Sequence, residues 1–179
     1  MDFTSITLNA AAKAMHDCVL PALASSGDRQ ALEQAHLVWD AIMFARDRVD
    51  LIDARRRTEV LELSTLMGQL MDLDSVRRLA VSDRMAQVHA ESLQVLAHPA
   101  STAREYSDLG VKLGETLTSL LAEADDLAAP TRSEIERAVL DHSLRKLELD
   151  RAWLLPLGLD PDPSTVRDLQ TLLKGGSAE

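Results

Sequence analysis

The fold is decided by residues 29–71, RQALEQAHLVWDAIMFARDRVDLIDARRRTEVLELSTLMGQLM, a stretch with no proline and a single glycine, Gly68. One heptad phase, with steps of three and four residues, holds throughout. Side chains spaced in this way lie on one face of an α-helix. The positions in this phase are Leu32, Ala35, Trp39, Ile42, Arg46, Val49, Asp53, Arg56, Val60, Leu63, Met67 and Leu70. The sequence therefore predicts one continuous helix about 65 Å long. A break near residues 50–57 is the alternative.

Three positions of this phase are charged, and we call Arg46, Asp53 and Arg56 the charged seam. A buried arginine cannot become neutral by losing a proton, so each would need a carboxylate or an anionic ligand beside it. One interpretation is a ligand-binding site in which the two arginines, around Asp53, hold a carboxylic acid or a phosphate. The other is that the helix leaves the core here, either into water or against a second subunit.

The segment at residues 45–53, ARDRVDLID, is similar to the first-helix signature of helical chorismate mutases. Enzymes of that family bind a dicarboxylate with arginines, so the resemblance implies an arginine-based site for such an acid. The similarity covers only this segment. It ends where Arg55, Arg56, Arg57 and Glu59 stand in place of the leucine run of that family. We therefore assign the chain to no family.

Prolines and N-capping residues divide the rest of the chain into helices. Pro21, Pro99, Pro130 and Pro156 are expected to stop or kink a helix. Outside the long helix, the predicted helices cover approximately residues 5–20, 76–97, 103–129, 132–155 and 164–173. Residues 76–97 and 132–155 each carry two apolar stripes, which predicts that other helices surround them. The expected fold is all-α: an up-and-down bundle of five main helices plus a short C-terminal helix. Residues 1–173 would form one domain and residues 174–179 a flexible tail.

Composition narrows the classes of function. The net charge is −10 at pH 7, and an acidic surface repels a phosphate backbone, so we expect no nucleic-acid partner. Cys18 is the only cysteine, which excludes an intramolecular disulfide and fits a reducing compartment. The first residues do not have the pattern of a secretory signal, and no apolar run has the length of a membrane span. We therefore expect a cytoplasmic protein without a membrane partner.

Asp83, Glu115 and His142 form a candidate catalytic set. Counting outward from the turns near Pro99 and Pro130 places the three residues at about one level of the bundle. A carboxylate beside a histidine inside a bundle is the minimum for general acid–base chemistry. The alternative is a core histidine that a carboxylate satisfies without any catalytic role.

A metal site is considered at the first helical hairpin. Glu33, His36 and Asp40 share one helical face, and His16 is expected at the same level on the preceding helix. Two imidazoles and two carboxylates would suit zinc or non-haem iron. A ferritin-like di-metal site, however, needs a second Glu-x-x-His pair. We therefore expect neither a metal nor a cofactor.

Two functions follow from these patterns. The first is a non-enzymatic helical binding or assembly protein that acts through its long amphipathic helix. As a homodimer, it would pair Arg46 with Asp53 of the partner subunit in an antiparallel arrangement. The alternative is a small-molecule enzyme or a ligand-binding pocket inside the bundle. There, arginines would hold a ligand that bears a carboxylate or phosphate.

Overall fold

The computed structural model describes residues 3–175, with side chains from Thr4 to Lys174. The chain is 85% helical, and no strand occurs in the described part. The predicted all-α bundle with a short C-terminal helix is confirmed. Of the predicted flexible tail, residues 176–179 lie outside the described residues, and Lys174 belongs to the last helix.

The predicted long helix is confirmed as one helical run of 43 residues. It consists of α3 (Arg29–Arg48), a single 3-10 turn η2 (Val49–Leu51) and α4 (Ile52–Met71), with no non-helical residue between them. Asp28 caps its start, because the Asp28 side chain accepts a hydrogen bond of 2.9 Å from the backbone N–H of Ala31.

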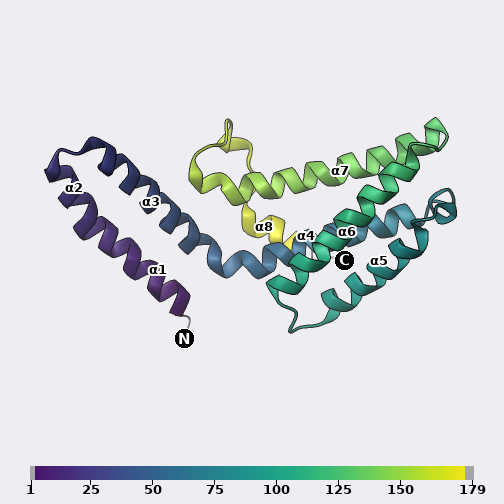
Figure 1. Ribbon diagram of the computed structural model, residues 1–179, viewed down its shortest axis with the longest axis horizontal. Helices are drawn as coiled ribbons and strands as arrows, with labels where there is room; N and C mark the ends of the chain where they lie inside the picture. Colours follow the sequence, from purple (N-terminus) through teal and green to yellow (C-terminus); the bar gives the residue numbers. More distant parts are fainter. Residues whose placement is uncertain (1–2, 176–179) are drawn as a thin grey trace. The chain divides into compact units, whose positions relative to one another are not determined.

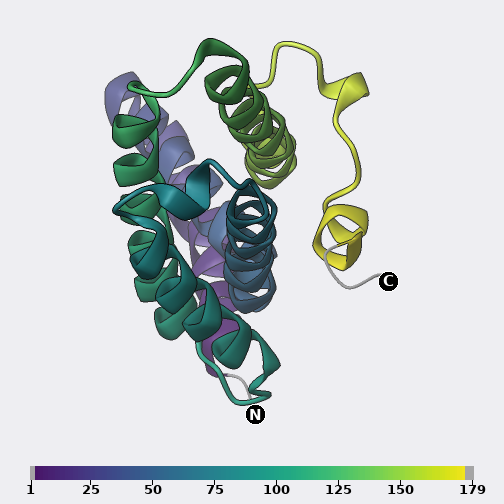
Figure 2. The ribbon, with the colours of Figure 1, turned by 90° about the vertical axis from the view of Figure 1, so that its right-hand side faces the viewer.

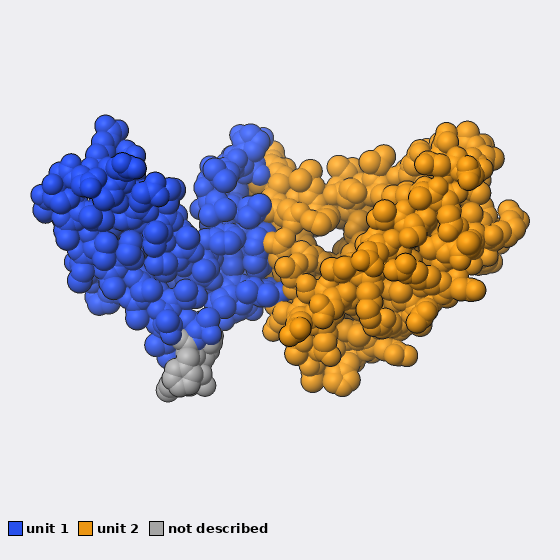
Figure 3. All heavy atoms as spheres, in the orientation of Figure 1, with its two compact units in different colours: residues 1–52, 153–163 blue, residues 53–152, 164–179 orange. Residues whose placement is uncertain are grey.

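The chain divides into two compact units, shown in Figure 3. Unit 1 comprises residues 1–52 and 153–163, and unit 2 comprises residues 53–152 and 164–179. The sequence places both in one domain because no linker separates them. The boundary after Ile52 lies within the helical run, so no loop, proline or glycine marks it.

Unit 1 begins with a continuous helical path that doubles back on α3 (Figure 1). The path consists of α1 (Phe3–Ala14), a π-helical turn η1 (Met15–Val19) and α2 (Leu20–Ser26). Of the two outcomes expected at Pro21, a stop or a kink, the stop is wrong, because the helix continues to Ser26. Pro21 stands in the first turn of α2, and the π turn before it accommodates the residue that lacks a backbone N–H.

The interior of unit 1 is small. Among its described apolar residues, Ala12 and Ala35 are buried where the two arms of the hairpin meet. At the other end of α3, Phe44 contacts Trp153 edge to face, with ring centroids 6.5 Å apart. The guanidinium of Arg48 lies over both rings and donates a 3.0 Å hydrogen bond from Nε to the backbone oxygen of Trp153.

Unit 2 contains most of the buried side chains. Its helices are α4, α5 (Ser82–Ala97), α6 (Ala103–Ala124), α7 (Ala129–Leu154), whose last two residues belong to unit 1, and α8 (Leu169–Gly175). Figure 2 shows α4 in the middle of this group. The core is a cluster of aliphatic residues with one tyrosine, drawn mainly from α4, α5 and α6. It includes Val60, Leu66, Met67, Leu70, Val76, Met85, Val88, Tyr106, Leu109, Leu113, Leu120 and Ile135.

Two details of α5 and α7 correct the sequence prediction. The predicted helix over residues 76–97 begins instead at Ser82, after a 3-10 turn η3 (Val76–Arg78). Of its two predicted stripes, the one with Val81, Met85 and Val88 is buried, and the one that ends at Leu93 is exposed. One of the two stripes of α7 is likewise exposed, at Leu140, Leu144 and Leu147. Both helices bury one face only, so the prediction that other helices surround them is wrong.

The C-terminal helix begins later than predicted. Ser164 lies in a 3-10 turn η5 (Pro163–Thr165) and does not start α8. Asp168 takes the capping role, because its side chain accepts a 2.8 Å hydrogen bond from the backbone N–H of Thr171.

The unit 2 core is expected to be sensitive to a cavity at Leu113, which is fully buried on α6. Replacing Leu113 by alanine removes buried methyl groups and leaves a void, so we expect a loss of about 2–5 kcal/mol in the free energy of unfolding. Urea denaturation followed by circular dichroism measures this value. Leu93→Ala, at an exposed site on α5, is the control and should change it by less than about 0.5 kcal/mol. Equal effects of the two substitutions would contradict the described core.

Candidate ligand-binding pocket

A pocket of about 560 Å³ lies within unit 2. Residues from α4, α6, α7 and the segment that includes α8 line it, and Figure 3 shows an opening through this part of the surface. Part of the wall is apolar and includes Val60, Leu63, Tyr106, Val111, Leu149 and Leu172. A volume of this size suits a small molecule.

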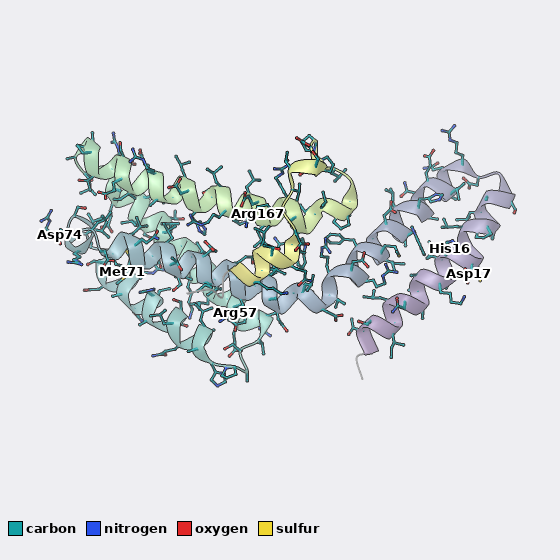
Figure 4. All side chains as sticks on the ribbon, turned by 180° about the vertical axis from the view of Figure 1, so that it is seen from behind. His16, Asp17, Arg57, Met71, Asp74 and Arg167 are labelled. Carbon is teal, nitrogen blue, oxygen red and sulfur yellow. The ribbon has the colours of Figure 1, made fainter. Side chains whose placement is uncertain are left out.

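Five cationic side chains line the same pocket: Arg55, Arg56, Arg145, Lys146 and Arg167. They come from three places in the sequence. Arg55 and Arg56 follow one another near the start of α4, and Arg145 and Lys146 do so in the second half of α7. Arg167 precedes α8, and Figure 4 shows it beside α7. The bundle therefore concentrates positive charge that the sequence distributes over more than a hundred residues.

Shared carboxylates organise the cations on α4 and α7. Glu59 pairs with Arg55 at 2.9 Å and with Arg56 at 2.7 Å. Asp150 pairs with Arg55 at 2.7 Å and with Lys146 at 2.5 Å. Arg55 thus connects α4 to α7, and its side chain is only 18% exposed.

Each of the remaining two cations pairs with a different carboxylate. Arg145 pairs with Glu62 at 2.9 Å, and Arg167 pairs with Glu148 at 3.2 Å. Glu59, Asp150, Glu62 and Glu148 thus hold the five cations in ion pairs. An arginine has five N–H donors in a planar fork, so one ion pair leaves donors that a ligand oxygen can accept from.

His142 lines the pocket from α7 and is 7% exposed. Burial lowers the pKa of its imidazole, and the positive charge of Arg145 lowers it further. The ring is therefore neutral at neutral pH, with one nitrogen that donates and one that accepts. Its Nδ1 is buried and has no hydrogen-bond partner among the described residues. An unsatisfied buried polar atom costs about 1–3 kcal/mol, so this nitrogen marks a place where a bonding partner would be stabilised.

The pocket contains one residue from each predicted site. Arg56 belongs to the charged seam and His142 to the candidate catalytic set, and both line the pocket. The other two seam residues do not line it. Asp53 is exposed on α4, and Arg46 lies on α3 of unit 1, where it pairs with Asp47 at 2.8 Å.

The other two members of the catalytic set lie elsewhere on unit 2. Asp83 is exposed on α5, and Glu115 is exposed on α6, where it pairs with Arg84 at 3.2 Å. Neither lines the pocket with His142. The structure thus brings His142 together with cations instead of with these carboxylates.

Arg55, Arg145, Lys146 and Arg167 were not among the predicted site residues. Arg55 and Arg56 both form ion pairs with Glu59. The sequence does contain a pattern that could have identified Arg145 and Lys146. They follow His142 by three and four residues and therefore lie on the same side of a helix. No comparable pattern points to Arg167.

Unit 1 has a shallower groove of about 450 Å³ at its hairpin. His16 and His36 both line it, and the rings of His16 and Trp39 lie 5.6 Å apart. His16 also contacts its neighbour Asp17, and both are labelled in Figure 4. Within residues 3–175, no three histidine, cysteine or acidic side chains are arranged to hold a metal ion.

Comparison of the chain with protein-family models, with curated proteins and with solved structures finds no match. The resemblance to helical chorismate mutases thus has no match to support it. Across the described part of the chain, no helix combines the length and the apolar character that a membrane span requires.

Removal of the Asp150 carboxylate should destabilise the fold. Asp150→Ala leaves the largely buried guanidinium of Arg55 with one carboxylate instead of two, so we expect a loss of about 1–3 kcal/mol in the free energy of unfolding. Asp108→Ala is the matched control, since Asp108 and Arg104 are exposed and 4.0 Å apart. That pair should contribute less than about 1 kcal/mol. Urea denaturation of both variants and the parent tests the difference, and equal losses would contradict it.

His142 should make stability depend on pH. Because its pKa is lower in the folded chain than the ordinary 6.5, the unfolded chain binds a proton first as the pH falls. The His142 contribution to the free energy of unfolding is therefore complete above about pH 6.5 and decreases below it. We expect the urea midpoint to decrease more between pH 7.5 and pH 5.5 in the parent than in His142→Gln. The same decrease in both proteins would show that His142 does not titrate in this way.

Proposed function

We propose that this protein binds a small amphipathic anion in the pocket of unit 2. The observation that supports the proposal is the convergence, on one hollow, of five cationic side chains, an apolar wall and a buried neutral histidine whose Nδ1 lacks a partner. Of the two functions inferred from the sequence, this is the alternative: a ligand-binding pocket inside the bundle.

The polar end of the ligand would be a carboxylate or a phosphate. Arginine recognises both groups with parallel N–H donors, and such charge-assisted hydrogen bonds are stronger than neutral ones. Arg56 and Arg145 suit this role because each is 45% exposed and can donate to a further oxygen beside its present carboxylate.

The apolar end would lie against the aliphatic part of the wall. Leu63, Leu149 and Leu172 belong to three different elements and all line the pocket. His142 would contribute its neutral imidazole to the same wall. This combination of apolar contact and a few polar groups is typical of small-molecule sites.

The first function inferred from the sequence, assembly through the long helix, stays a second candidate. Leu37 and Val38 are exposed on α3 and favour a partner on that helix. The charge pairing proposed for it has less support, since Arg46 already pairs with Asp47 of its own chain.

Calorimetric titration with decanoate and decyl phosphate tests the ligand proposal. We expect both anions to bind and neutral decanol to bind at least about tenfold more weakly, because it cannot pair with the arginines. Arg145→Met should weaken binding of both anions by about tenfold or more. Arg84→Met removes an equally exposed arginine outside the pocket and should leave binding unchanged.

Two outcomes would overturn the proposal. One is that neither anion binds at millimolar concentration. The other is that the anions bind, but Arg145→Met and Arg84→Met have the same affinity, which would place the binding outside the pocket.

A further inference from the structure

Helix α6 supplies an uncharged wall of the pocket. Its lining residues in the described part of the chain are Tyr106, Ser107, Gly110 and Val111, none of which carries a charge. The five cations belong instead to α4, to α7 and to the segment before α8. An apolar group that lies against α6 therefore displaces water without removing a charged side chain from it, which makes this wall the favourable place for the apolar end of a ligand.

Gly110 leaves open space in this wall. Apart from the backbone of its own helix and its chain neighbours, a Cβ atom at this position would meet one heavy atom of the described residues within 4 Å. That atom is Cγ2 of Val60, at 4.0 Å, which is an ordinary van der Waals distance. Val60 on α4 and Gly110 on α6 both line the pocket. A side chain at position 110 would therefore extend into the hollow between these two helices.

The backbone of α6 does not require glycine at position 110. Gly27 and Gly158 are the glycines with a positive φ in the described part of the chain, so Gly110 has a conformation that other residues adopt. A glycine in the interior of a helix is also less favourable than alanine, because it loses more conformational freedom on folding. No contact closer than 4.0 Å compensates for this cost. What the missing side chain does provide is room in the pocket.

We propose that Gly110 determines the length of the apolar chain that the pocket accepts. The polar end of the anion pairs with the arginines of α4 and α7, and its chain lies over Gly110, between Val60 and Val111. The ligand class is then an anion whose chain is long enough to reach α6. This inference rests on the proposed function, because it assumes that the pocket binds an amphipathic anion. Gly110 itself touches only the apolar end.

The dependence of affinity on chain length measures this contact. Transfer of one methylene group from water to an apolar site tightens binding by about fourfold, so a chain that lies over Gly110 gains affinity with each further carbon atom. A larger residue at position 110 would occupy the same space and end this gain. It would leave the arginines able to pair with the polar end. A general loss of stability, by contrast, would weaken short and long chains alike.

Calorimetric titration of the full chain with hexanoate and decanoate tests the proposal. Gly110→Leu should weaken decanoate binding by about tenfold or more and hexanoate binding by less than about threefold. Gly114→Leu is the matched control, since it adds the same side chain one helical turn later. A Cβ atom at Gly114 would meet no described atom within 4 Å, and Gly114 does not line the pocket. Both affinities should stay unchanged in this control.

Gly110→Ala is a milder variant that keeps the test valid if leucine disturbs the helix. It adds a single methyl group at an ordinary contact distance from Val60 and favours the helical backbone. We expect it to fold, as circular dichroism would show. We also expect it to weaken decanoate binding by about fourfold, because the methyl group replaces about one methylene of the chain.

Thiol protection locates the bound chain directly. The background is Cys18→Ser, which removes the exposed natural cysteine. In this background, the rate at which a thiol reagent modifies Gly110→Cys is measured with and without decanoate. At ten times its Kd, decanoate occupies about nine tenths of the pockets and should slow the modification about tenfold. Gly114→Cys should react at the same rate with and without decanoate.

Three results would overturn the proposal. The first is that Gly110→Leu and Gly110→Ala bind decanoate as tightly as the parent while Arg145→Met does not, which would keep the proposed function and place the chain elsewhere in the pocket. The second is that Gly110→Leu weakens hexanoate and decanoate equally, which would show that position 110 does not select for chain length. The third is that the parent binds neither anion, which would overturn the proposed function as well.

Discussion

The pocket depends on Arg55, whose guanidinium pairs with Glu59 on its own helix and with Asp150 on α7. Helix α7 contributes one fully buried residue, Ile135 near its start, to the aliphatic core cluster of unit 2. Further along, the ion pairs of Arg55 with Asp150 and of Arg145 with Glu62 connect α7 to α4. Long charged side chains bridge helices without filling the space between them. A hollow therefore remains where leucines would have closed the interface.

This construction has an energetic consequence. Partial removal of a charged side chain from water costs free energy unless the charge has a partner with good geometry. Apolar residues of similar size would stabilise the same contact at least as well. The paired charges around the pocket are thus poorly explained by stability alone. A role in binding explains them better, because a preformed set of arginines recognises an anion without first losing the entropy of its own side chains.

The two faces of α7 differ in the chemical character of their side chains. The pocket face carries paired charges and a buried histidine, and the outer face carries the exposed Leu140, Leu144 and Leu147. Residues on opposite sides of a helix have different neighbours, so changes on one face leave the contacts of the other in place.

Local sequence was sufficient for the helices. The uninterrupted heptad phase of residues 29–71 and the capping residues Asp28 and Thr102 specify helices through contacts between near neighbours, and the structure contains both caps. The local sequence did not predict the π turn before Pro21, because that turn depends on how the two arms of the hairpin meet. The local sequence also did not predict which apolar stripes of α5 and α7 are exposed, since an apolar pattern is the same whether or not another helix packs against it.

The candidate site belongs almost wholly to the tertiary structure. The sequence pointed to Arg56 and His142 separately, each within a set whose other members lie elsewhere. Arg55, Arg145 and Arg167 join them only because α4, α7 and the segment before α8 meet around one hollow. The sequence by itself determined where the helices run, because helix formation depends on residues a few positions apart. The tertiary structure decided which charges converge, because that depends on how helices far apart in the chain pack against one another.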